Sequence, residues 1–221
     1  MRHDSTRARC LSVAALAAAC SLLTVAPASA ANPAGVASLG SADFTKSGQA
    51  PVAVPALAPC DVHEQTSNTS GLVSGPGVKF GGGTSRCTTT VVDPGSGETT
   101  TSEADGRDFE LSALLSVGGP RIRLANYKVT CTASSQGTKP SWTFSGLSGI
   151  SGLPEQIPSN HVHQVTKSDG TILAEVVFNE VIVPEPGDGS VALNALHIRF
   201  APASQISGDV VIGATACAPT G

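Results

Sequence analysis

The chain has 221 residues, of which 40% are hydrophobic, 14% charged and 4% aromatic, with 24 glycines, 15 prolines and a formal net charge of −4. The low charged fraction excludes a coiled coil or long-helix protein, and the small net charge with many β-branched residues excludes charge-driven disorder. The acidic balance argues against a nucleic-acid partner, because a phosphate-binding surface requires an excess of Lys and Arg.

Residues 1–30 have the three parts of a secretory signal peptide. They begin with a basic region, continue with an apolar run over 10–26 and end with small residues. We expect cleavage after Ala30, and no later segment is long and apolar enough to span a membrane. Two alternatives stay open: an uncleaved membrane span, for which the run is at the short limit, and lipidation at Cys20, which follows three alanines.

Residues 31–59 are rich in Ala, Pro, Gly and Ser, and their apolar residues show no sustained period. This composition predicts a flexible or partly extended lead-in, from which a few residues could add an edge strand. We therefore expect one folded domain over 60–221.

Four cysteines remain after removal of the leader: Cys60, Cys87, Cys131 and Cys217. An even number in an oxidising compartment predicts two disulfides, although sequence alone leaves three pairings open. We favour Cys60–Cys87, which ties an early segment to the first strand pair, and Cys131–Cys217, which fastens the last strand to the middle of the domain. A zinc site is disfavoured because the cysteines are scattered and none form a C-x₂-C pair.

Short β-branched runs separated by Gly, Pro, Asp and Ser follow from residue 60 onward, and no window has the pattern of a capped amphipathic helix. The sequence Ser168-Asp169-Gly170 is a hairpin signal. This pattern predicts an all-β fold, an antiparallel β-sandwich of jelly-roll or immunoglobulin-like type held by disulfides. Strands are expected at 86–93, 98–103, 108–117, 121–134, 141–152, 161–167, 171–183, 190–200 and 209–217.

The segment 121–134 alternates with period two, so its side chains divide between two faces. We expect the face toward the core to be formed by Arg123, Ala125, Tyr127, Val129 and Cys131.

The carboxyl-terminal part carries three recognisable segments: an Asn-Glu pair at 179–180, Asn-Ala-Leu-His at 194–197 and Val-Ile-Gly at 211–213. These resemble the choice-of-anchor P family of exported actinobacterial proteins, and the similarity spans most of 70–217. The resemblance implies an extracellular β-domain whose members reach the cell surface by differing anchors. It implies no assigned catalytic activity.

His161 and His163 lie two residues apart on a predicted strand, so both project from one face and could chelate a metal, with His197 or His63 as a third ligand. The alternative, which we favour, is a polar outer face without a metal. We expect His161, His163 and His197 to lie apart. For His197 we predict a structural role, as a buried ring that hydrogen-bonds the backbone.

Two other groups have alternative interpretations. The acidic residues Glu103, Asp105, Asp108 and Glu110 could bind calcium, but they lack the ligand spacing of a calcium loop and indicate a solvated turn between strands. Trp142 or Tyr127 could form a sugar-stacking platform if exposed, whereas a single Trp in a β-domain is more often part of the core.

The sequence contains no coherent catalytic set and no cofactor motif. It therefore predicts a secreted, non-enzymatic protein that acts outside the cell or at the cell envelope by interaction, with polysaccharide or protein as candidate partners. The alternatives are a carbohydrate-binding module and a metal-dependent enzyme that uses His161 and His163.

Overall fold

The computed structural model describes residues 32–93 and 97–219. The expected signal peptide, its cleavage site after Ala30 and Cys20 lie outside these residues. Within them the chain forms antiparallel strands and two short 3₁₀-helices, Ala113–Val117 and Pro202–Ser204, but no α-helix. The predicted all-β, antiparallel β-sandwich is confirmed. No helix in the described part of the chain is long and apolar enough to cross a membrane.

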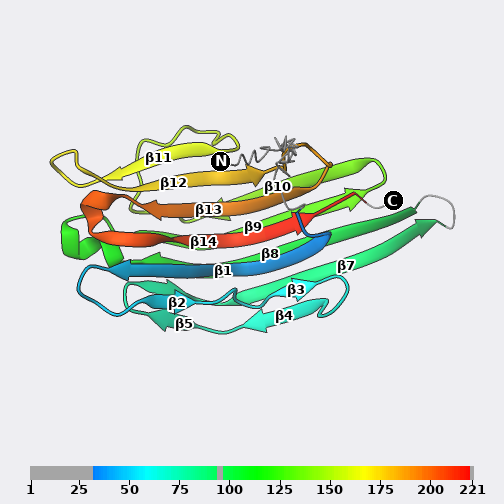
Figure 1. Cartoon of the computed structure of the whole chain (residues 1–221), viewed down its shortest axis with the longest axis horizontal. Coiled ribbons are helices and arrows are strands. Elements are labelled where there is room, and N and C mark those ends of the chain that lie inside the picture. Colours follow the sequence, from blue (N-terminus) through cyan, green and yellow to red (C-terminus); the bar gives the residue numbers. More distant parts are fainter. Residues whose placement is uncertain (1–31, 94–96, 220–221) are drawn as a thin grey trace, which may run out of the picture.

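Two sheets form the sandwich, and Figure 1 shows sheet A in front of strands β8 to β10 of sheet B. Sheet A has the order β11-β12-β13-β14-β1-β2, with β3 also paired to β1; sheet B has the order β10-β9-β8-β6-β5, with β7 paired to both β8 and β4. The strands of sheet A are β1 (Gly35–Lys46), β2 (Val52–Val54), β3 (Cys60–Asp61), β11 (His161–Thr166), β12 (Ile172–Ile182), β13 (Val191–Phe200) and β14 (Ile206–Cys217). Those of sheet B are β4 (Ser67–Ser70), β5 (Val73–Gly75), β6 (Val78–Phe80), β7 (Gly83–Asp93), β8 (Gly97–Leu111), β9 (Ile122–Ser134) and β10 (Gly137–Ser145).

The expected lead-in over 31–59 is wrong for most of its length. It contains β1, a 12-residue strand that pairs along its length with β14 and on its other side with β2 and β3. Leu39 and Phe44 of this strand are almost completely buried. The small residues of β1 allow close packing: a Cβ on Gly40 would lie 2.4 Å from the carbonyl oxygen of Val211. The folded domain therefore begins near Gly35 rather than at Cys60.

Both disulfides join sheet A to sheet B. Cys60 of β3 is bonded to Cys87 of β7, and Cys131 of β9 is bonded to Cys217 of β14. The favoured pairing is thus confirmed. The hairpin at 168–170 is also present, with the Gly170 amide donating to the Lys167 carbonyl at 3.0 Å between β11 and β12.

One row of residues interrupts the alternation of side chains across sheet A. The antiparallel register continues on both sides of this row, with Phe178 opposite Leu196 and Glu180 opposite Asn194. Phe178 nevertheless points into the core, whereas Glu180, two residues later, lies on the outer face with Asn194. The residues of the row are Asn179, Ala195, Gly213 and Leu39, from β12, β13, β14 and β1.

Backbone conformation explains this shift. Asn179 has φ 51° and Gly213 has φ 61°, both in the left-handed region that Asn and Gly enter at least cost. A left-handed residue inside a strand turns the following side chains to the other face. As a result, residues three apart in β13 share the outer face of sheet A.

Sheet B has a similar shift, which partly overturns the predicted buried face of 121–134. Tyr127, Val129 and Cys131 are buried as expected, but nearer the start of β9 the buried residues are Ile122 and Leu124. The reason is again local: Asp108 of β8, at the corresponding position of the β8–β9 pair, has φ 51°. Arg123 and Ala125 are therefore exposed.

Tyr127 connects the two sheets through its hydroxyl group. The side chain is 2% exposed, and its hydroxyl donates to the Leu39 carbonyl oxygen at 2.7 Å. Burial, with a smaller effect of the Asp105 charge, raises the pKa of this phenol. We expect Tyr127→Phe to lower the free energy of unfolding by about 1–3 kcal/mol, because the Leu39 carbonyl would stay buried without its donor. Urea denaturation measures this, and an unchanged midpoint would contradict it.

Candidate functional site

A polar cluster lies on the outer face of sheet A, away from sheet B. Glu180 of β12 is its centre, and its Oε2 accepts from the Asn194 Nδ2 at 2.8 Å and lies 2.7 Å from the His197 Nδ1. Arg199 donates to the other carboxylate oxygen, and the His197 Nε2 lies 2.9 Å from the Asp209 Oδ2. We call these five residues from β12, β13 and β14 the polar cluster.

Glu180 is a carboxylate buried on the outer face of a sheet, with only 6% of its surface exposed. Burial raises the pKa of Glu180, but hydrogen bonds from His197 and Asn194 and the charges of His197 and Arg199 outweigh it. The pKa of Glu180 therefore lies below its ordinary value. The cluster holds this carboxylate in its ionised form.

The pKa of His197 is shifted in the opposite direction, above its ordinary value. Its hydrogen bond with Glu180 raises the pKa of the imidazole, burial opposes this, and the hydrogen bond with Asp209 adds to the increase. The expected structural role as a ring bonded to the backbone needs correction, because both ring nitrogens are bonded to carboxylates. The protonated ring, with two N–H donors, satisfies both partners.

Among the described residues, no hydroxyl group is hydrogen-bonded to the His197 ring. Both ring nitrogens of His197 are bonded to carboxylates, those of Glu180 and Asp209. On the outer face, His197 of β13 is paired with Val211 of β14, and Val211 is paired with Ser41 of β1. Two strand spacings separate His197 from this hydroxyl, roughly 10 Å, which is too far for direct proton transfer.

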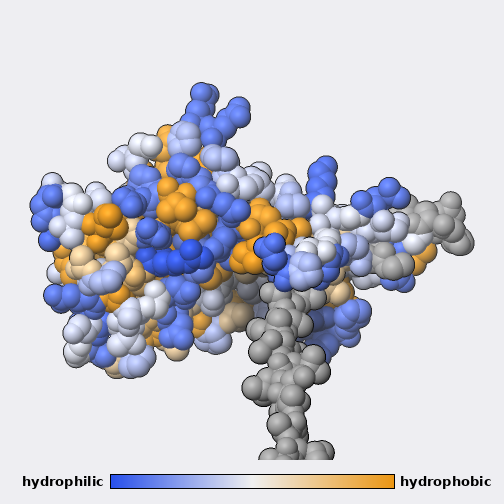
Figure 2. Space-filling model, turned by 45° about the horizontal axis from the view of Figure 1, so that its top comes forward, coloured by the Kyte–Doolittle hydropathy of each residue, from blue (hydrophilic) through white to orange (hydrophobic). Residues whose placement is uncertain are grey.

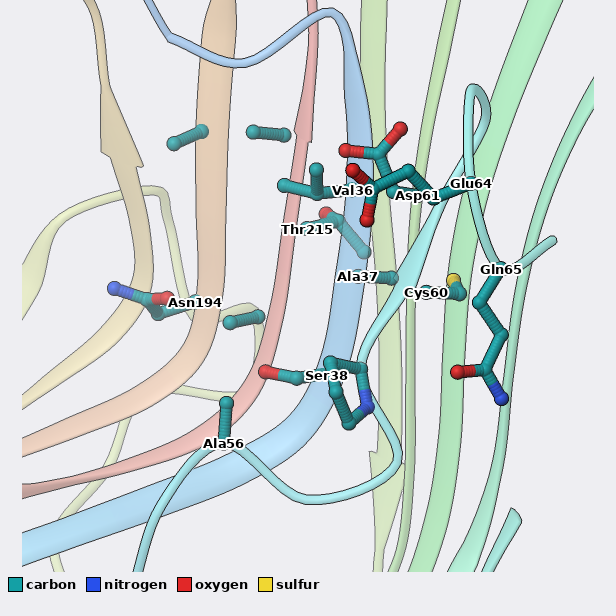
Figure 3. A pocket seen from close by; sticks show the side chains of 14 residues that line it. Val36, Ala37, Ser38, Ala56, Cys60, Asp61, Glu64, Gln65, Asn194 and Thr215 are labelled. Carbon is teal, nitrogen blue, oxygen red and sulfur yellow. The ribbon is translucent and has the colours of Figure 1, made fainter. Parts of the chain in front are cut away.

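A cleft of about 440 Å³ opens beside the cluster on the same face (Figure 3). Its floor is formed by outward-facing small residues of β1, β13 and β14, among them Val36, Ala192, Ala214 and Ala216. Its wall is the segment 56–65, which carries Asp61, Glu64 and Gln65 at one end of the cleft. Asn194 belongs to both the cleft and the polar cluster.

The wall is fastened to β1 and to sheet B. Backbone hydrogen bonds join Leu39 and Gly40 of β1 to Leu57, and the disulfide of Cys60 joins the wall to β7. At its far end, the Asp61 amide donates to the Gln65 carbonyl at 2.9 Å, which closes a tight turn. Because alanines form the floor and the wall is held away from it, the space between them stays open.

The four histidines proposed as metal ligands do not form one group: only His161 and His163 lie near each other. His161 and His163 are on β11 and share the inner face of sheet A, where the His161 ring lies 6.2 Å from the Phe178 ring, so the favoured polar outer face is wrong for this pair. His197 lies on the outer face, and His63 is exposed in the cleft wall. Burial, together with the charge of His161, lowers the pKa of His163. Within 32–93 and 97–219, no group of three His, Cys, Asp or Glu residues could hold a metal ion.

The acidic residues of the predicted calcium site are not in a turn. Glu103, Asp105, Asp108 and Glu110 all belong to the single long strand β8, so the expected turn between two strands is wrong. Two of them form ion pairs with the neighbouring strand β9: Glu103 with Lys128 at 2.8 Å, and Glu110 with Arg123 at 2.9 Å.

Neither aromatic residue proposed for sugar stacking has an exposed ring face available. Tyr127 is buried, and Trp142 of β10 faces inward and packs against the core. All eight aromatic residues of the chain are buried or packed against this core: Phe44, Phe80, Phe109, Tyr127, Trp142, Phe144, Phe178 and Phe200. The platform predicted for a carbohydrate-binding module is therefore not formed by these residues.

The outer surface has no broad apolar face in the view of Figure 2, where apolar residues form small patches among polar ones. Its larger exposed hydrophobic residues include Val162 on β11, Ile182 at the end of β12 and Val183 directly after it. The cleft on sheet A is thus a better candidate for recognition than any flat apolar surface in this view.

Sequence reasoning missed most of this site. It named His197 but not Glu180, Asn194 or Asp209 as its partners, because strict alternation places Asn194 and His197 on opposite faces. The available signal was Asn179, a residue type that readily takes a left-handed conformation, within a run of strand formers.

Comparisons of this chain with protein-family models, curated proteins and solved structures found no match. The polar cluster and the adjoining cleft are therefore the observations from which a function has to be inferred.

Proposed function

We propose that this protein is a non-enzymatic binding domain that acts outside the cytoplasm and takes its ligand in the cleft on the outer face of sheet A. The observation that carries the proposal is the position of the cleft: an open hollow of about 440 Å³ beside a preorganised polar cluster. Concave, mostly apolar sites with a few fixed polar groups are the usual form of ligand sites.

Two features support the extracellular setting. The two disulfides are the kind of cross-link that persists in oxidising compartments, and the basic, apolar and small-residue segments of 1–30 have the pattern of an export signal. Membership of the choice-of-anchor P family is part of the same proposal. It is supported by the fact that residues carrying the resemblance, among them Glu180, Asn194 and His197, lie in one cluster.

Binding without catalysis is supported by the saturated hydrogen bonding of the cluster. Glu180 is engaged by three side chains and both nitrogens of His197 are occupied, so the cluster is built to stay in one geometry. Such a cluster fixes the position of Asn194, and this side chain also lines the edge of the cleft.

An NMR screen of short peptides, amines and oligosaccharides against the exported chain tests this function. We expect chemical-shift changes from at least one compound class to concentrate at 36–38, 56–65, 192–194 and 214–216. Ala192→Trp, which fills the floor, should abolish them, whereas Val162→Trp on the same outer face should not. Turnover of any compound, or shifts spread evenly over the molecule, would contradict the proposal.

A further inference from the structure

Four polar side chains around the cleft, those of Asn194, Gln65, Asp61 and Glu64, carry acceptor oxygens, and Ser38 adds a hydroxyl. Asn194 donates its amide nitrogen to the Glu180 carboxylate, which has only acceptors, so the orientation of the amide group is fixed. Figure 3 shows its oxygen on the side of the cleft. This end of the site therefore offers an acceptor to a ligand.

Gln65 repeats the arrangement at the other end. Its Nε2 donates to the Ser67 carbonyl oxygen at 3.3 Å, and Figure 3 shows its Oε1 directed toward the cleft. Asp61 and Glu64, from the same wall segment, place their carboxylates near Val36, and they are the only charged side chains among the described residues that line the cleft. Two carboxylates thus lie together near Val36, and the Gln65 oxygen lies apart from them, beside Cys60.

The floor between the two ends is mostly apolar. Val36, Ala192, Ala214 and Ala216 present methyl groups, and no aromatic ring lines the cleft within the described residues. An aromatic cage for a quaternary ammonium is therefore lacking. A thin aliphatic chain fits such a floor, because long basic side chains commonly lay their methylene groups along apolar surface and keep the charge at the edge.

From these observations we infer that the cleft binds a primary ammonium on an aliphatic stem, as carried by the lysine side chain of an extended peptide. The ammonium donates N–H groups to the Asp61 and Glu64 carboxylates, which lie together. The stem lies over the alanines, and a backbone N–H of the peptide donates to the Asn194 oxygen. This inference rests on the proposed function and names the ligand of the same site.

The size of the site agrees with such a ligand. Asp61 is paired with Val36 of β1, while Asn194 is paired with Ala214, which in turn is paired with Ser38 of β1. Three strand spacings and a two-residue offset along β1 separate Asp61 from Asn194, roughly 16 Å. The Asn194 side chain extends toward Glu180 on β12 and the Asp61 side chain lies near Val36. One lysyl residue with its flanking peptide groups spans the remaining distance.

The test uses N-acetyl-Ala-Lys-Ala-amide, the same peptide acetylated on the lysine Nζ, and the same peptide with norleucine in place of lysine. NMR titration of the exported chain should show the lysine peptide binding at the cleft residues. The acetylated and norleucine peptides should bind at least about tenfold more weakly, because each lacks the charged hydrogen bonds. A tenfold rise in salt should weaken only the lysine peptide.

Variants then locate the ammonium. Asp61→Asn with Glu64→Gln should weaken the lysine peptide about tenfold, and Asp61→Asn still accepts the His63 amide hydrogen bond of the turn. Asp43→Asn with Glu155→Gln makes the same change in net charge outside the cleft lining and should have no effect. Loss of binding in this control pair would overturn the inference, because the weaker binding of the Asp61 and Glu64 variant would then be explained by net charge alone.

The outcomes separate this inference from the proposed function. Equal binding of the lysine and norleucine peptides at the cleft, or binding there of other compounds but not of the lysine peptide, overturns the ammonium inference and leaves the binding function standing. Absence of any ligand at the cleft, with Ala192→Trp behaving as the wild type, overturns both.

Discussion

Replacing Cys131 and Cys217 with alanine is expected to lower the free energy of unfolding by about 4.6 kcal/mol, which follows from the 86-residue separation of the two cysteines. The bond restricts the unfolded chain, and a longer loop loses more entropy when it is closed. A loss of this size is a large part of the total stability of an ordinary domain. Guanidinium denaturation under oxidising conditions measures it against the wild type.

The second disulfide provides the matched comparison. Cys60 and Cys87 are separated by 27 residues, so their removal is expected to cost about 3.5 kcal/mol. Cys60 also anchors the wall of the cleft, whereas Cys131 and Cys217 pack with Ala133 and Val191 in a separate apolar cluster. Equal losses from the two pairs, or a larger loss at Cys60 and Cys87, would contradict the loop-length account.

The β class and most strands could be predicted because they depend on short-range patterns. Turn residues separate the β-branched runs, and the hairpin at 168–170 needs only its own three residues. The lead-in was misjudged because β1 is rich in Gly, Ala and Ser, which are usual in flexible segments. In the folded chain these small residues permit contact, as at Gly40 against Val211, and only the position of β14 reveals it.

The site depends on long-range pairing, which composition and period do not contain. Asn179 and Gly213 each shift a strand by one position, and the shifts must coincide across the sheet to bring Glu180, Asn194 and His197 to one face. A prediction that assumes uninterrupted alternation along each strand places Asn194 and His197 on opposite faces of the sheet. The cleft escaped prediction for a related reason, since its wall lies in the segment assigned to the lead-in.

Glu180→Ala is expected to lower the free energy of unfolding by about 3 kcal/mol, at the lower end of the cost of breaking a buried ion pair, because Arg199 is half exposed. The alanine leaves His197, Asn194 and Arg199 without their common acceptor. Glu180→Gln keeps the shape and one acceptor oxygen, so its loss should be about 1–2 kcal/mol. Urea denaturation at neutral pH compares the two variants, and equal losses would contradict a role for the charge.

The pH dependence of stability gives a second test of the same cluster. The pKa of His197 is raised from 6.5, so its contribution is complete below that value and is lost as the pH rises through the folded-state pKa. The pKa of Glu180 is lowered from 4.5, so its contribution is present above that value and is lost as the pH falls through the folded-state pKa. The cluster therefore stabilises the fold most between these limits. His197→Gln should remove the decline on the alkaline side while leaving most of the decline on the acidic side, and a variant that declines above pH 6.5 as steeply as the wild type would show that another group is responsible.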